Sequence, residues 1–265
     1  MGGTTAKACL IEDGRAQIAA MMEAGRVHRF KKGSGLPIKA PVIDMIEIGA
    51  GGGSIARIDE VGLLRVGPHS AGADPGPACY GRGGTQATVT DANLTLGWYD
   101  PGFFLGGRMT LDAVAAGKAV GALGATLNLT PVETAWGIAK VVTESMTAAA
   151  RVHLVEKGKD PRRYAMVGFG GAGPAYAAMV ARALGVREVI VPPASGAASA
   201  LGFLVAPLSF EQVRSMPLVM EPGFDPAPVN ATLAALEAEG RRLLAEAGVP
   251  PAEIRVERSA DMRLV

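Results

Sequence analysis

Three clusters of glycine constrain the fold of this chain more than any other feature of its sequence. They are Gly2-Gly3, Gly49 with Gly51–Gly53, and Gly168–Gly173, and each adjoins a run of apolar residues typical of a β-strand. The chain holds 36 glycines and 18 prolines in 265 residues, which disfavours a helical bundle, since a glycine inside a helix costs about 1 kcal/mol relative to alanine. The sequence therefore predicts strands joined by glycine turns, with helices beside them.

Charge and composition exclude several classes of protein. Lys and Arg number 26 and Asp and Glu 25, so no attraction to nucleic acid or to an anionic membrane is expected. Hydrophobic residues make up 49% and charged residues 19%, which excludes a disordered chain. The 2 cysteines are too few for a disulfide framework and indicate a reducing compartment.

Glycine and proline interrupt the uncharged stretches 164–181 and 189–210, and no signal peptide is recognisable. A cytoplasmic protein without membrane spans is therefore expected.

Periodicity and turn signals predict a mixed α/β order of strands, then helices, then a strand–helix–strand unit. The clearest element is a helix over 130–158, with Thr130 and Glu133 as a capping box and Trp136, Val142 and Met146 on its buried face. The strands at 8–11, 43–48, 55–58 and 63–66 are expected to share one sheet under this helix. Further strands are expected at 17–20 (as the hairpin partner of 8–11), 164–168, 188–191 and 253–257, and further helices at 111–123 (capped by Thr110), 175–184, 195–204 (capped by Ser195) and 229–247.

The third glycine cluster fits the pattern G-x-G-x-x-G of dinucleotide-binding sites, because it follows a strand and opens a helix. An NAD-binding oxidoreductase is therefore one alternative. However, Glu188 precedes its strand, whereas the acid that binds ribose should end it, and Pro174 stiffens the start of the helix. A glycine turn at a helix N-terminus, suited to phosphate, is the simpler interpretation. The first two clusters could also bind an anion through backbone N–H groups, or be a flexible terminus and a turn.

A few polar residues could carry chemistry. Cys79 could be a nucleophile with His69 as its base, although a structural cysteine is favoured, since no group that lowers its pKa is evident nearby. Asp91 could be a helix cap or a catalytic carboxylate. His28 and His153 are expected to be surface or helix-flank histidines and not ligands, and the 3 histidines lack the spacing of metal ligands. The metal ligands, if any, therefore stay unknown.

Several motifs follow one another along the chain. They are Met-Gly-Gly-Thr-Thr-Ala-Lys at 1–7, Glu-Ile-Gly-Ala-Gly-Gly-Gly-Ser-Ile-Ala at 47–56, Val-Gly-Pro-His-Ser-Ala-Gly-Ala at 66–73, Asp-Pro-Gly-Pro-Ala-Cys-Tyr-Gly at 74–81, Thr-Val-Thr-Asp-Ala-Asn at 88–93, Asp-Pro-Arg at 160–162 and the glycine cluster at 168–173. In this order they resemble the hydantoinase A/5-oxoprolinase family, over nearly the whole chain.

The resemblance implies an actin-like (ribonuclease H-like) ATPase lobe with a mixed sheet and flanking helices. Residues 1–215 would be the second lobe, and 216–265 the truncated start of a C-terminal segment. The N-terminal lobe would lie upstream of this chain. The implied activity uses ATP and Mg²⁺ to phosphorylate a carbonyl or amide oxygen, for hydrolysis of a cyclic amide or carboxylation of a ketone. The implied partner is a hydantoinase B-type subunit or domain, and a non-catalytic module that docks this partner is the alternative.

The resemblance also implies site residues. The segments Gly2–Thr5 and Gly170–Gly173 are expected to line one cleft, and Asp91 and His69 are candidate catalytic residues. Lys7 stands where many family members carry Asp, and Tyr176 where many carry His, which leaves the substrate open. The residues expected to bind ATP are Gly2, Gly3, Thr4, Thr5, Lys7, Gly51, Gly52, Gly53, Gly170, Gly171, Ala172 and Gly173.

Overall fold

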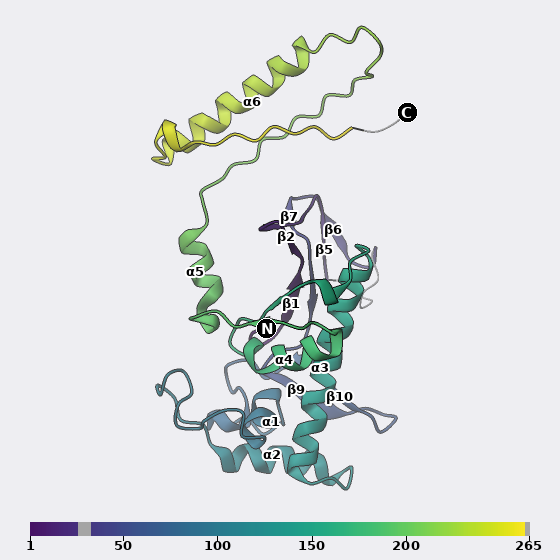
Figure 1. Ribbon diagram of the computed structural model, residues 1–265. Helices are drawn as coiled ribbons and strands as arrows, with labels where there is room; N and C mark the ends of the chain where they lie inside the picture. Colours follow the sequence, from purple (N-terminus) through teal and green to yellow (C-terminus); the bar gives the residue numbers. More distant parts are fainter. Residues whose placement is uncertain (26–32, 263–265) are drawn as a thin grey trace. The chain divides into compact units, whose positions relative to one another are not determined.

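The computed structural model describes residues 1–25 and 33–262 (Figure 1). The chain divides into two units, which we call unit 1 (Met1–Leu201) and unit 2 (Gly202–Val265). His28 lies outside the described residues. The domain boundary expected after residue 215 remains a prediction.

Short antiparallel ladders form the N-terminal part of unit 1. A tight turn at Asp13 and Gly14, both with positive φ, joins β2 to β3 and closes a hairpin at once. Residues 15–16 therefore take the hairpin position predicted for 17–20. The predicted pairing is wrong, although a short strand does lie at 18–19 and pairs elsewhere. The paired strands are β1 (Ala6–Cys9) with β8 (Met45–Ile48), β2 (Ile11–Glu12) with β3 (Arg15–Ala16), β4 (Ile18–Ala19) with β7 (Val42–Ile43), and β5 (Met22–Ala24) with β6 (Leu36–Ile38).

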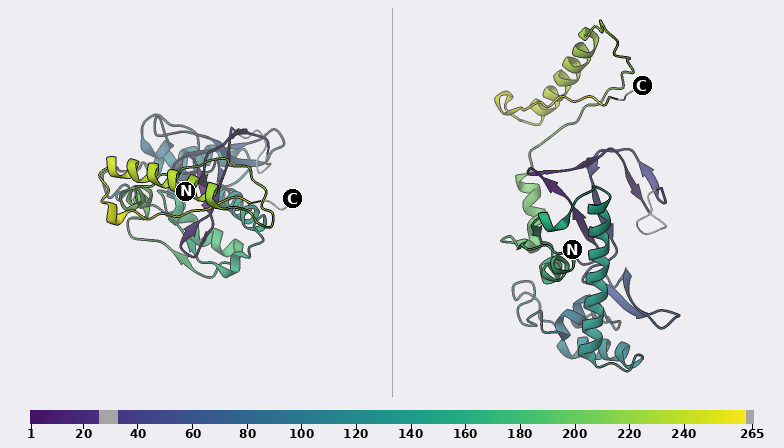
Figure 2. Two further views of the ribbon diagram at one scale, coloured as in Figure 1. Left: turned by 90° about the horizontal axis from the view of Figure 1, so that it is seen from above. Right: turned by 45° about the vertical axis from the view of Figure 1, so that its right-hand side comes forward.

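The four strands predicted to share one sheet lie in separate two-stranded ladders. β9 (Ser54–Ile58) pairs with β10 (Leu64–Ser70), and β8 pairs with β1. The single-sheet prediction is wrong because the glycine residues between β8 and β9 turn the chain, and their N–H groups donate to other segments. Helix α3 (Pro131–Val155) contacts both ladders (Figure 2), so the predicted packing of this helix on these strands is confirmed.

The helices begin at predicted caps in some places and not in others. The Thr130 and Glu133 side chains form the expected capping box at the start of α3. Helix α2 (Ala113–Ala125) begins after Asp112, not Thr110, because the Asp112 carboxylate accepts from two N–H groups of the first turn. The other elements of unit 1 are η1 (Ala78–Tyr80), α1 (Val89–Thr95), η2 (Pro161–Arg163), β11 (Met166–Val167) parallel to β12 (Val189–Ile190), α4 (Gly173–Leu184) and η3 (Ser195–Ala197).

Helix α5 (Ala198–Val205) follows η3 directly, and the Ser195 side chain caps neither of them, contrary to prediction. Unit 2 contains α6 (Ala227–Glu246) and the short η4 (Pro251–Glu253). The strand predicted at 253–257 is absent, since residues 254–262 have no regular structure. None of the described residues of unit 2 is buried. Within the described ranges, no helix is both long enough and apolar enough to cross a membrane.

The core of unit 1 consists mainly of small aliphatic side chains around α3. Val142 is buried as predicted and Met146 is half-buried, whereas Trp136 is 42% exposed, so its predicted burial is wrong. The Trp136 ring stands edge-on to Trp98, with 6.4 Å between ring centroids, and Lys140 Nζ lies 5.6 Å from the Trp136 centroid. A tryptophan at the margin of a core keeps these contacts while its polar edge meets water. His153, expected at the surface or on a helix flank, lies in the last turn of α3 and is buried.

Candidate functional site

The three glycine clusters of the sequence come together in unit 1. We call Gly2–Thr5 the first glycine segment, Gly51–Gly53 the second and Gly170–Gly173 the third. Gly52 N donates to Gly2 O at 2.9 Å, and Gly53 N donates to Gly3 O at 2.7 Å. Ala172 N and Gly173 N both donate to Met1 O at 3.1 Å. The residue before the first segment thus contacts the third, and the second segment lies beneath the first.

The second glycine segment is a floor for the first. Its three glycines are buried, and a Cβ on Gly51 would lie 2.4 Å from Thr4 N and 2.5 Å from Gly3 C. Only glycine therefore lets the first segment approach this closely. Its N–H groups already donate to Gly2 O, Gly3 O and the Ser54 hydroxyl. These N–H groups thus already have acceptors within the protein. This favours a role for the second segment as a support of the first, and not as a donor to a ligand.

The third glycine segment has a similar division of roles. Gly170 has a φ of +93°, and a Cβ there would lie 2.3 Å from Met1 O. Gly170 N donates to Ser195 O, while Ala172 and Gly173 use their N–H groups on Met1 O. Gly171 differs, because it is exposed and has open space where a Cβ would be. Of this segment, Gly171 is the residue best placed to meet a ligand.

A few backbone donors at this site remain available. Among the residues that the structure describes, Gly3, Thr4 and Gly171 donate no hydrogen bond from the backbone N–H, and all three residues are exposed. Gly171 precedes Ala172, the N-cap of α4, whose N-terminus carries the positive end of the helix dipole. Exposed N–H groups and a helix N-terminus favour an anion. Thr4 and Thr5 add hydroxyl groups beside them.

Lys7 is directed to a different partner. In the ladder of β1 and β8 it lies opposite Glu47, and its Nζ is 3.4 Å from Glu47 Oε1. Strand alternation puts it on the face opposite to Ala6, which is buried. The structure therefore pairs Lys7 with a carboxylate, and a phosphate contact for this residue remains a prediction.

Asp91 is a structural cap in this fold. Its carboxylate is fully buried and accepts from Thr88 N at 2.9 Å, Thr88 Oγ1 at 2.7 Å, Ala78 N at 3.2 Å and Cys79 N at 2.8 Å. These contacts complete a capping box on α1 and attach η1 to it. Four donors occupy the acceptor positions of this carboxylate. Of the two interpretations left open for Asp91, the structure supports capping.

Cys79 and His69 form no reactive pair in this structure. Cys79 is fully buried, and burial, together with the nearby Asp91 carboxylate, raises the pKa of its thiol well above the usual range. A thiol in this environment stays protonated and unreactive. His69 is exposed on β10, and its proposed catalytic role remains a prediction. The described part of the chain holds no group of three or more His, Cys, Asp or Glu that could bind a metal ion.

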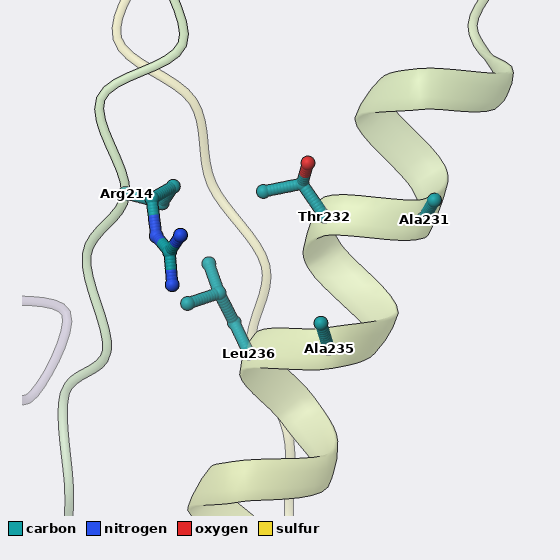
Figure 3. A pocket seen from close by; sticks show the side chains of 5 residues that line it. All are labelled: Arg214, Ala231, Thr232, Ala235 and Leu236. Atoms are coloured by element: carbon teal, nitrogen blue, oxygen red, sulfur yellow. The ribbon is translucent and has the colours of Figure 1, made fainter.

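A separate pocket of about 290 Å³ lies in unit 2, between α6 and the segment that precedes it (Figure 3). Its lining combines one cation and one hydroxyl with small apolar side chains, and it contains none of the residues expected to bind ATP. The lining residues are Arg214, Ala231, Thr232, Ala235 and Leu236.

The comparisons with known proteins agree with the motifs of the chain. The family model described as Hydantoinase/oxoprolinase matches residues 1–212. The caprolactamase subunit alpha of Pseudomonas jessenii is 35% identical over 250 residues, covering 94% of this chain and 35% of that protein. The acetophenone carboxylase gamma subunit of Aromatoleum aromaticum is 37% identical over 190 residues, covering 70% of this chain and 26% of that protein. The nucleotide-free structure of acetone carboxylase matches with a TM-score of 0.78 and 26% identity, covering 96% of this chain and 36% of that one.

The chain belongs to the hydantoinase/oxoprolinase family. Its mixed α/β fold resembles those of acetone carboxylase and of the caprolactamase of Pseudomonas jessenii. It spans about a third of the length of the caprolactamase subunit alpha and of the acetone carboxylase chain, and 26% of the acetophenone carboxylase gamma subunit. The family match gives no support to an NAD-binding oxidoreductase or to a purely non-catalytic module.

Proposed function

We propose that the first and third glycine segments bind the phosphates of ATP within a larger ATP-dependent enzyme. The observation that carries this proposal is the set of N–H groups of three exposed residues, Gly3, Thr4 and Gly171, which come from adjoining segments and have no acceptor within the described residues. The segments that carry these groups form a closely packed backbone cradle, because a Cβ on Gly51 or Gly170 would collide with backbone. Such a backbone cradle beside a helix N-terminus fits a phosphate group.

The proposed reaction is phosphorylation of a carbonyl or amide oxygen. The γ-phosphoryl group of ATP would pass to the oxygen of a cyclic amide or of the enol form of a ketone, with release of the amide N–H or α C–H proton and departure of ADP. The phosphate would activate the amide carbon for attack by water, or hold the ketone as an enol phosphate. Such transfers need positioning and charge stabilisation more than covalent chemistry by the protein. The N–H groups of Gly3, Thr4 and Gly171 would supply hydrogen bonds to the phosphate oxygens as charge develops on them. Hydrolysis or carboxylation would follow.

Mg²⁺ is the expected companion of ATP. It takes an octahedral set of oxygen ligands and often keeps several waters. Asp91 is saturated by four donors, and within the described residues no cluster of carboxylates lies at the site. The hydroxyls of Thr4 and Thr5 fit the oxygen donors that Mg²⁺ prefers, and we propose that most of its other ligands are phosphate oxygens and water.

Two further parts would complete the enzyme. The resemblance implies an actin-like lobe, and we propose that the remainder of a longer polypeptide supplies the opposite lobe around ATP. A hydantoinase B-type partner would carry out the step after phosphorylation. Two relatives are named as subunits, caprolactamase subunit alpha and acetophenone carboxylase gamma subunit, which is consistent with a multi-subunit enzyme.

The test compares two glycine-to-alanine changes in the enzyme assembled with its remaining lobe and B-type partner. Gly51→Ala pushes a methyl group into Thr4 N, whereas Gly117→Ala, on α2 and outside the candidate site, meets no atom within 4 Å. We expect Gly51→Ala to weaken Mg-ATP binding at least about tenfold, equivalent to 1.4 kcal/mol, and Gly117→Ala to leave it within about threefold. Calorimetry gives the affinities, and ATP hydrolysis stimulated by 5-oxoproline, a hydantoin, caprolactam or acetone identifies the substrate class. Equal affinities in all three proteins, or no ATP binding by the unchanged enzyme, would contradict the proposal.

A further inference from the structure

Helix α1 is short, yet its side chains reach several other elements. Thr90, Asp91 and Asn93 are buried, and each makes a hydrogen bond outside the helix. Asp91 attaches η1, as described above. Thr90 reaches the second glycine segment, and Asn93 reaches α4, which follows the third segment. One helix thus connects to two of the three parts of the candidate site.

Thr90 anchors the floor of the site at one carbonyl group. Its Oγ1 and its backbone N both donate to Gly52 O, each at 2.8 Å. Gly52 N in turn donates to Gly2 O at 2.9 Å. One residue, Gly52, therefore separates the Thr90 hydroxyl from the first glycine segment. A Cβ on Gly52 would lie 2.9 Å from Thr90 Oγ1, so the two residues are in close contact.

Asn93 anchors the helix that follows the third glycine segment. Its Oδ1 accepts from the Tyr176 hydroxyl at 2.6 Å, and its Nδ2 donates to the Tyr99 hydroxyl at 3.1 Å. Tyr176 lies near the start of α4, is fully buried, and packs edge-on against Trp98 with 5.6 Å between ring centroids. Both polar atoms of the Asn93 side chain are thus used. Tyr176 is the position where the sequence left the substrate open, and here its hydroxyl faces the interior.

We infer that Thr90 and Asn93 are positioning residues, which fix the second glycine segment and α4 relative to each other through α1. The spacing between the first and third segments, and hence between the donors of Gly3, Thr4 and Gly171, then depends on α1. This inference rests on the proposed function for its effect on ATP. Its structural part, the placement of the glycine segments, can be measured without a nucleotide.

Thr95 provides a matched control for Thr90. It lies on the same helix, and its hydroxyl donates to Asp91 O at 2.8 Å, within that helix. Thr90→Val and Thr95→Val therefore remove the same group, and only the first breaks a bond to a glycine segment. Thr90→Ser keeps the hydroxyl and serves as the rescue variant. Tyr176→Phe removes the donor to Asn93 and tests the second anchor separately.

The experiment measures two properties of the assembled enzyme. Hydrogen exchange without nucleotide reports on the amides of Gly52 and Gly53, and steady-state kinetics give KM for ATP and kcat. For Thr90→Val we expect exchange at these amides to become at least about tenfold faster and KM for ATP to rise about tenfold, with a smaller change in kcat, because a lost buried hydrogen bond costs about this factor. Thr90→Ser should resemble the unchanged enzyme, and so should Thr95→Val. Tyr176→Phe should raise KM for ATP in the same direction.

The outcomes separate this inference from the proposed function. If the enzyme uses ATP and Thr90→Val behaves like Thr95→Val in both measurements, the positioning role is wrong. If the enzyme does not bind ATP, the proposed function fails, and the exchange rates then decide the inference alone. Exchange that is faster in Thr90→Val but not in Thr95→Val supports the positioning of the segments. Unchanged exchange in Thr90→Val overturns it. A Tyr176→Phe enzyme with unchanged KM would overturn the role of Asn93.

Discussion

At the scale of single residues, Glu12 shows how one carboxylate ties together distant parts of unit 1. It accepts from Lys159 Nζ at 2.7 Å, from the Tyr164 hydroxyl at 2.8 Å and from Gln17 Nε2 at 3.1 Å. The hydrogen bond from Lys159, followed by that from Tyr164, holds the pKa of Glu12 below its ordinary value of 4.5. The group stays ionised in the fold at pH values where it is partly protonated in the unfolded chain.

This lowered pKa predicts a pH-dependent stability. A carboxyl whose pKa is lower in the folded state stabilises the fold above its unfolded pKa, and the contribution is lost as pH falls through the folded pKa. Glu12→Gln should therefore lower Tm at pH 7, and the difference from the unchanged protein should shrink below pH 4.5. Thermal unfolding followed by circular dichroism from pH 3 to pH 7 measures it, with the exposed Glu60→Gln as control. A Tm difference that is constant with pH would contradict the prediction.

The ligand-binding roles of the glycines stay predictions, and only their arrangement in the fold can be compared with the sequence. The structure places the three glycine runs of the chain next to one another. The sequence shows where glycine allows another backbone segment to approach closely. It does not show which N–H groups are used internally, and this depends on contacts such as Gly52 N to Gly2 O across distant parts of the chain. The sequence also does not show that Thr90 contacts Gly52, and the adjacent Asp91 is the more obvious candidate for chemistry.

At the scale of elements, the capping box of α3 is a local feature with a measurable effect. Thr130 Oγ1 accepts from Glu133 N, and the Glu133 carboxylate accepts from both Thr130 N and Thr130 Oγ1. Thr130→Ala should destabilise the protein by about 1 kcal/mol, the usual cost of losing an N-cap. Urea unfolding would measure this, with Thr126→Ala as the control, since the exposed Thr126 hydroxyl contacts only Leu123 O. Equal losses in the two variants would show that the cap contributes nothing specific.

Elements whose signals are local were predicted more accurately than the pairing of strands. The start of α3 at its capping box follows from residues within one turn, and so does the end of α4 at Gly185, which has a φ of +74°. The assignment of four strands to one sheet was wrong, because the sequence of a strand of four or five residues does not specify which strand it pairs with. The pairing of the strands depends on turns at Gly14 and at the second glycine segment, because a single residue in each turn changes the direction of the chain.

At the scale of the whole molecule, the available donors predict weak nucleotide binding by this chain alone. Gly3, Thr4 and Gly171 are exposed, and each hydrogen bond to a solvated phosphate exchanges for one to water at a net gain of about 1 kcal/mol. This chain covers 35% of the caprolactamase subunit alpha and 36% of the acetone carboxylase chain that it matches, and the proposed second lobe would exclude water and strengthen each contact. Calorimetry with Mg-ATP on residues 1–265 should therefore show no binding tighter than about 1 mM, near −4 kcal/mol. Micromolar binding would show that the site is complete in this chain.

The close fit of the second glycine segment has a consequence for length as well as for composition. Gly52 N meets Gly2 O and Gly53 N meets Gly3 O, one residue against one residue, while Thr90 meets Gly52 O from the other side. Inserting a single residue between Gly52 and Gly53 would break this one-to-one match with Gly2 O and Gly3 O. We therefore expect such an insertion to abolish the site, although it leaves every predicted ligand-binding residue in the sequence.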